Sequence, residues 1–164
     1  MTDRPALTLL HLGPGYANGI ANLHNASRAH VPVLNMIGDH ATHHLELDAP
    51  LTSDIAGLTA AVCDWTGVSS SSDNLAKVGL EAWQASMSYP GKVTAFVAPA
   101  NHAWEPANSD TPIPVIESAK TVCDEEITKA VEALRDGSAT AIFLGGHALR
   151  ETGLYQAGRI AEAT

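Results

Sequence analysis

The stretch HLGPGYANG, residues 11–19, joins an apolar segment to a helix-forming one. Residues 6–12 are typical of a buried strand, residues 16–30 of a helix, and residues 31–37 of the next strand. A strand, a glycine-rich turn and a helix start in this order place backbone N–H groups where they can face a ligand. On its own, the turn is equally compatible with a plain strand-to-helix connection.

Apolar and amphipathic segments alternate along the rest of the chain. This pattern predicts an α/β fold with a largely parallel sheet and helices on both faces. The expected strands are 7–11, 33–37, 64–68, 93–98 and 140–144. The expected helices are 16–29, 53–62, 72–88, 124–135 and 150–162, the third of them capped by Ser72 or Asp73.

Prolines divide the chain into a long first part and a short second part. Pro106, Pro112 and Pro114 lie among polar residues, which is typical of a linker. We therefore expect a first α/β domain over 1–105, a linker over 106–121, and the strand and helix that open a second domain over 122–164.

Composition excludes several classes of function. The 164 residues carry a formal net charge of −9, which argues against nucleic acid or an anionic membrane as a partner. No signal-peptide pattern and no apolar run long enough to span a bilayer is present. Cys63 and Cys123 are far apart in sequence and lack metal-site spacing, so two free thiols in a cytoplasmic protein are expected.

Several motifs follow one another in a specific order: GPGYAN, then VPVLNMIGDH, the acidic loop ELDAPLTSDIAGL, and the strand KVTAFVAPA after a Pro-Gly turn. Together they resemble the N-terminal, pyrimidine-binding domain of thiamine-diphosphate-dependent enzymes of the acetolactate synthase and benzoylformate decarboxylase type. The resemblance covers residues 5–107, and 122–164 is similar to the start of that family's central domain. It implies an incomplete doubly wound pyrimidine-binding domain.

The resemblance implies a function as well as a fold. It implies thiamine diphosphate as cofactor, a 2-oxo acid as substrate, carbon–carbon lyase or carboligase chemistry, and a homodimer or homotetramer. Magnesium would be held by a domain that this sequence does not match, and use of FAD stays open. The sequence does not separate a decarboxylase from an acetolactate synthase.

The family's activating glutamate and its Gly-Asp-Gly metal motif find no counterpart in this sequence. The resemblance therefore implies a piece of such an enzyme that is inactive alone. It also implies a sheet edge left uncovered, with 7–12 prone to aggregation unless a partner covers it.

The resemblance also assigns candidate site residues. His11 would be a catalytic proton-transfer group at a strand end, since an imidazole titrates near neutral pH. His43 and His44 would face the substrate. The cofactor-binding candidates are Gly13, Pro14, Gly15 and Asn18. The plainer alternatives are a His11 ring that caps the strand end and an Asn18 side chain that serves turn or capping chemistry.

Two other classes of function stay open. On a helix, His40, His43 and His44 would share one face, and three imidazoles beside carboxylates favour a transition-metal site in a hydrolase or metal-binding module. Alternatively, the chain is a non-enzymatic remnant or interaction module that uses its open sheet edge.

Overall fold

A computed structural model describes residues 4–108, 110–116 and 121–164. The chain forms two compact units, Met1–Ser118 and Ala119–Thr164. The division between them falls inside the expected linker. Part of that segment is hydrogen-bonded to the first unit, where Gln84 Nε2 donates to the Val115 carbonyl at 3.1 Å.

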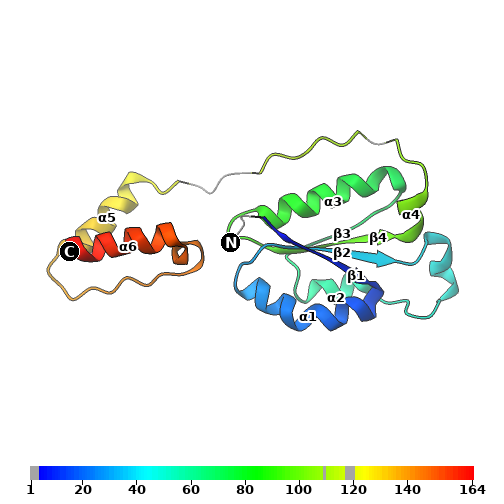
Figure 1. Cartoon of the computed structure of the whole chain (residues 1–164), viewed down its shortest axis with the longest axis horizontal. Coiled ribbons are helices and arrows are strands. Elements are labelled where there is room, and N and C mark those ends of the chain that lie inside the picture. Colours follow the sequence, from blue (N-terminus) through cyan, green and yellow to red (C-terminus); the bar gives the residue numbers. More distant parts are fainter. Residues whose placement is uncertain (1–3, 109, 117–120) are drawn as a thin grey trace. The chain divides into compact units, whose positions relative to one another are not determined.

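The first unit is built on a four-stranded parallel sheet in the order β1-β2-β4-β3. The strands are β1 (Ala6–His11), β2 (Val33–Asp39), β3 (Trp65–Val68) and β4 (Val93–Pro99). Helices α1 (Leu12–Arg28) and α2 (Ile55–Ala60) cover one face, and α3 (Ser72–Met87) covers the other (Figure 1). The predicted α/β class, parallel sheet and two-sided helical cover are confirmed.

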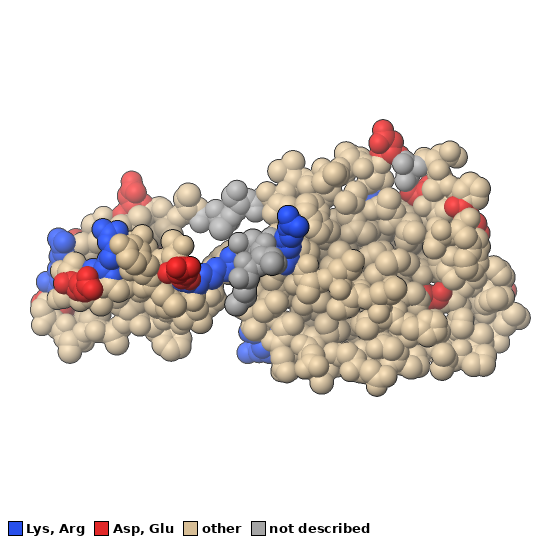
Figure 2. Space-filling view, in the orientation of Figure 1, with Lys and Arg blue, Asp and Glu red and all other residues tan. Residues whose placement is uncertain are grey.

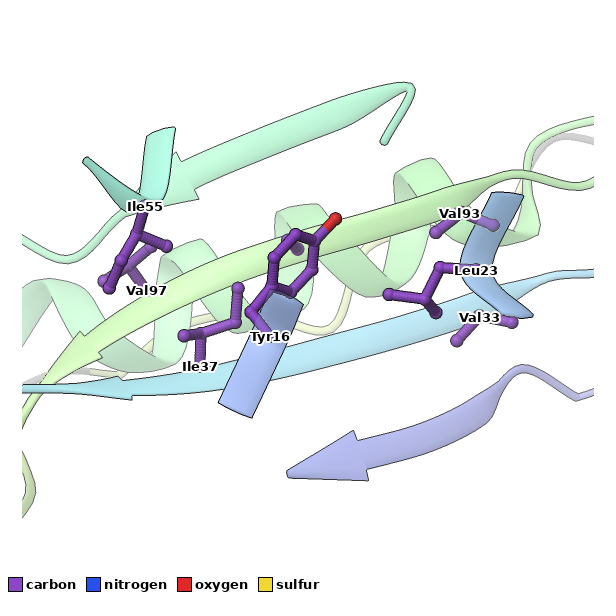
Figure 3. Close-up of a cluster of buried hydrophobic side chains, with 8 residues drawn as sticks. Tyr16, Leu23, Val33, Ile37, Ile55, Val93 and Val97 are labelled. Atoms are coloured by element: carbon purple, nitrogen blue, oxygen red, sulfur yellow. The ribbon is translucent and has the colours of Figure 1, made fainter. Parts of the chain in front are cut away.

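The two faces of the sheet carry separate hydrophobic clusters, because successive strand residues point to opposite faces. The larger cluster lies under α1 and α2, and Figure 3 shows Tyr16 in its middle. Leu23, Val33 and Val93 lie to one side of this ring, and Ile37, Ile55 and Val97 lie to the other. The smaller cluster joins the opposite face of β2 and β4 to α3 through Leu34, Val78, Ala82, Phe96 and Ala98.

Side-chain caps fix the starts of two helices. The Asp54 carboxylate accepts from Gly57 N at 2.8 Å, so α2 begins at Ile55. The Ser71 hydroxyl accepts from Asn74 N at 3.2 Å and caps α3. The prediction that Ser72 or Asp73 caps this helix is wrong by one or two residues, because the extended backbone that a cap needs occurs at Ser71.

The connection from β1 to α1 is sharper than expected. Helix α1 begins directly at Leu12, whose φ of 54° lies in the left-handed region. The predicted start at Tyr16 is therefore wrong, and Gly13–Pro14–Gly15 forms the first helical turn rather than a loop before it. Proline is tolerated there, since the first helical N–H groups have no partner within the helix.

One edge of the sheet is open. Strand β1 pairs only with β2, and its Leu7 and Leu9 side chains are 70% and 75% exposed. They alternate with Thr8 and Leu10, which are partly buried on the α1 side. The expected apolar sheet edge is therefore present.

The second unit is helical in its described part. It contains α5 (Asp124–Arg135), the 3-10 turn η2 (Gly146–Leu149) and α6 (Glu151–Ala163). The predicted strand over 140–144 is wrong: these residues are irregular, and Phe143 is fully exposed. A strand needs a hydrogen-bonding neighbour, and the described residues offer none to this segment.

Charged side chains are sparse over the sheet-containing unit in the view of Figure 2. This agrees with a charged fraction of 16% in the sequence. Among the residues that the structure describes, no helix is both long and apolar enough to cross a membrane.

Candidate functional site

A cavity with a volume of about 220 Å³ lies at the carboxyl ends of β1, β2 and β4. Its walls come from the ends of these strands and from the segments that follow them. The lining residues are His11, Leu12, Asp39, His40, Ala41, His43, His44, Ala100 and Trp104. This is the edge where parallel α/β sheets bind ligands.

The strand register brings these residues together. His11 pairs with Gly38, and Asp39 pairs with Pro99, so three strands end at one level of the sheet. The segments after them therefore leave the sheet side by side. Sequence positions 11, 39–44 and 100–104 converge for this reason, although they are far apart along the chain.

His11 lies at the point where β1 turns into α1. Its side chain is exposed and makes no capping hydrogen bond to the helix, and the first turn of α1 has no acidic residue. The structure therefore does not support the alternative in which the His11 ring caps this junction. An imidazole that lines a cavity without a capping role is available to a ligand.

The glycine-rich turn has a packing function. A Cβ on Gly13 would lie 2.3 Å from Ser53 Cβ, so only glycine lets this turn of α1 approach the segment before α2. Gly13 is buried, whereas Pro14 and Asn18 are exposed. Asn18 lies in the second turn of α1, because the helix begins six residues earlier, at Leu12.

The histidine cluster follows β2 but does not form a metal site. His43 and His44 lie on the 3-10 turn η1 (Thr42–Leu47), with ring centroids 4.3 Å apart. His40 precedes this turn, and its Nε2 lies 3.0 Å from the Pro50 carbonyl. Within the described part of the chain, no group of three His, Cys, Asp or Glu side chains could hold a metal ion.

Helix α4 (Ala100–Trp104) follows β4 and touches the segments on both sides of it. Asn101 is hydrogen-bonded to Thr42, at the start of η1. His102 Nδ1 lies 3.0 Å from Ser69 Oγ, just after β3. The sequence pattern did not predict this helix or the place of Trp104 in the cavity, although their position after a central strand could have indicated them.

Tyr16, which is buried, and Cys63, which is half-buried, form a polar pair. Tyr16 OH and Cys63 Sγ are 3.3 Å apart, within the cluster under α1. Burial raises the pKa of the Tyr16 phenol, and the contact with Cys63 raises it further. Burial also raises the pKa of the Cys63 thiol, although its hydrogen bond with Tyr16 lowers it in part. Both groups are therefore held neutral, and neither lines the cavity.

Comparison with known proteins shows what the chain resembles. Residues 1–61 match the family model described as the thiamine pyrophosphate enzyme, N-terminal TPP binding domain. Over these residues the chain is similar to the N-terminal domain of thiamine pyrophosphate enzymes. The whole chain is 38% identical to a protein of Mycobacterium tuberculosis named as an acetolactate synthase large subunit, over 31% of that protein's length.

Solved structures of the thiamine pyrophosphate family share the fold. A thiamine diphosphate-dependent 4-hydroxybenzoylformate decarboxylase of Rhodococcus jostii superposes with a TM-score of 0.71 and 17% identity, over 79% of this chain and 25% of that one. Benzoylformate decarboxylase of Polynucleobacter necessarius gives a TM-score of 0.63 and 18% identity, over 80% and 25%. The chain thus spans a quarter to a third of the length of these relatives.

The residues present fit one part of the cofactor of this family. The cavity is lined by His11, His43 and His44 beside Trp104, so aromatic and imidazole rings that could pack against a planar ring surround it. Among the described residues, no group of three His, Cys, Asp or Glu side chains is placed to hold the magnesium of such a cofactor.

Proposed function

We propose that this chain supplies the pyrimidine-domain side of a thiamine-diphosphate-dependent active site that acts on a 2-oxo acid. One observation carries the proposal: four histidines, His11, His40, His43 and His44, line a single cavity at the carboxyl edge of the sheet. The similarity to thiamine pyrophosphate enzymes supplies the cofactor, and the cavity supplies the groups that would face the substrate.

The histidines suit the charge of a 2-oxo acid. The bound cofactor supplies the nucleophilic carbon for attack on the 2-oxo group. Imidazole N–H groups can donate to the substrate carboxylate, and the uncapped amino end of α1 beside His11 favours a negative charge. His11, which makes no capping hydrogen bond to α1, is the proposed proton carrier.

The remaining cofactor assignments are part of this proposal. Gly13, Pro14 and Gly15 would contact the cofactor from the first turn of α1, and Asn18 would contribute from the next turn. Magnesium would be bound by residues from outside the described part of this chain, in an assembly of two or more subunits. The imidazole at His11 favours decarboxylation over acetolactate synthesis, and use of FAD stays open.

The experiment is a titration of the full chain with benzoylformate, followed through histidine ring signals by NMR. Benzoylformate is chosen because a structural relative acts on this class of acid. We expect the signals of His11, His43 and His44 to shift with a single dissociation constant. His24 and His30, which are exposed and do not line the cavity, are internal controls.

Matched variants connect the response to the cavity. His11→Gln should weaken binding of benzoylformate, because it removes one ring from the lining, whereas His24→Gln should leave it unchanged. Equal shifts at all histidines, or none at His11, His43 and His44, would contradict the proposal. Repeating the titration with thiamine diphosphate tests the cofactor assignment separately.

A further inference from the structure

The turn that carries His43 and His44 has no buried side chain of its own. All residues of η1 (Thr42–Leu47) are exposed, so hydrophobic burial does not hold this turn against the sheet. A segment of this kind opens easily unless polar contacts fix it. The contacts that fix it come from α4.

Asn101 makes these contacts from a buried position. Its side chain is 5% exposed, and its Oδ1 accepts from the backbone N of Thr42 at 2.9 Å. Its Nδ2 donates to Thr42 Oγ1 at 3.1 Å and to Glu105 Oε1 at 2.9 Å. The side chain thereby joins the first residue of η1 to the end of α4.

The partners determine which end of the amide faces which group. The Thr42 backbone N–H can only donate, and a Glu105 carboxylate can only accept. An amide satisfies both at once, whereas a carboxylate at this position would have no hydrogen for Glu105. Leaving a buried polar group without its partner lowers the free energy of unfolding by more than the hydrogen bond itself contributes.

We propose that Asn101 is a positioning residue that latches η1 in the arrangement that presents His43 and His44 to the cavity, an inference that rests on the proposed function of these histidines. Asn101 does not itself line the cavity. It acts through Thr42, which precedes the two histidines directly along the chain.

The test is Asn101→Asp in the full chain, which keeps the shape of the side chain but removes its N–H donors. Amide hydrogen exchange over residues 42–47 should become faster by about tenfold, while exchange in β2 and β4 stays unchanged. Asn108→Asp is the matched control, because it makes the same chemical change at an exposed residue beyond α4. It should leave η1 unchanged.

A second substitution tests the hydrogen bond directly. In Asn101→Asp/Glu105→Gln, the new amide at position 105 can donate to the new carboxylate, so slow exchange over 42–47 should return. A purely structural role predicts faster exchange throughout the first unit and no rescue. Either of those results would contradict the proposal that Asn101 positions η1. Unchanged exchange over 42–47 in Asn101→Asp would contradict it as well.

The histidine signals separate this inference from the proposed function. In Asn101→Asp, the signals of His43 and His44 should move in the free protein, and their response to benzoylformate should be lost. If the wild-type chain gives no response to benzoylformate, the proposed function fails, whereas the exchange and rescue results still decide whether Asn101 latches the turn.

Discussion

At the scale of single residues, the pair of buried Tyr16 and half-buried Cys63 shows how burial controls reactivity. The two side chains are 3.3 Å apart in the core under α1, and burial raises the pKa of both. Cys123, by contrast, is exposed. The two thiols of the chain should therefore behave differently towards the same reagent.

We predict that iodoacetamide modifies Cys123 at least about tenfold faster than Cys63 at pH 8, because the thiolate is the nucleophile. Mass spectrometry of the full chain over time measures both rates. Tyr16→Phe should slow Cys63 further, since the Tyr16 hydrogen bond lowers the pKa of this thiol. Faster modification of Cys63 in this variant would show that the substitution opens the core instead.

The same pair predicts the effect of alkaline pH. Both groups have a raised pKa in the folded state, so their contribution to stability is present below the unfolded pKa values and is lost as the pH rises above them. The melting temperature should therefore fall above about pH 9, where an unfolded cysteine ionises. The double variant Tyr16→Phe/Cys63→Ala should show a smaller fall between pH 8 and pH 11 by circular dichroism.

At the scale of elements, the junction of β1 and α1 decides how the site is built. The left-handed Leu12 turns the chain within one residue, and Gly13 lets the new helix approach the segment that precedes α2. The glycines of this helix therefore differ in what they tolerate. Gly13 has no room for a Cβ, whereas a Cβ at Gly19 would make ordinary contacts at 3.7 Å.

Gly13→Ala should lower the free energy of unfolding by about 1–3 kcal/mol, as expected for an overpacked position. Gly19→Ala in the same helix should leave it unchanged or raise it by up to about 1 kcal/mol, because alanine favours the helix. Urea denaturation of both variants and the parent chain measures the difference. Equal stability of the two variants would mean that the contact with Ser53 relaxes without cost.

The elements also show what the sequence could predict. The strand 93–98 is completely buried as β4, and its continuous apolar pattern was a reliable signal. The helix start at Leu12 was not predictable by pattern, because a leucine with a φ of 54° is set by tertiary packing rather than by local preference. The apolar run 140–144 has the pattern of a strand but finds no neighbour in the described residues, so the pattern alone was misleading there.

The candidate site was predicted in part. His11, His43 and His44 meet at one cavity as their places after two strands suggested, and their proposed roles stay predictions. Asn101 and Trp104 were missed, because a short helix after β4 leaves little periodic signal. Gly13 lies in a tight contact with Ser53, a role that only the three-dimensional packing reveals.

At the scale of the whole molecule, the two units differ in how they are stabilised. The first has two buried clusters on a parallel sheet. In the second, none of the residues described over 121–164 is buried. Folding free energy therefore comes mainly from the first unit, and its weak point is the open edge at β1.

Leu9→Lys should reduce aggregation of the full chain several-fold while leaving its melting temperature within a few degrees, because the side chain is 75% exposed. Light scattering against concentration measures the first effect, and circular dichroism measures the second. Leu10→Lys is the control: this residue packs against the α1 cluster, so its substitution should unfold the first unit. If Leu9→Lys aggregates as much as the parent chain, the exposed strand β1 is not the surface through which the chain aggregates.

The paired ends of the strands also limit how this protein can change length during evolution. His11 is in register with Gly38, and Asp39 with Pro99, so one residue gained or lost within a strand would turn every following side chain to the opposite face of the sheet. Insertions and deletions should accumulate in the connections between strands and helices instead. A family of such sequences would then keep constant spacing within each strand and vary in the distance between strands.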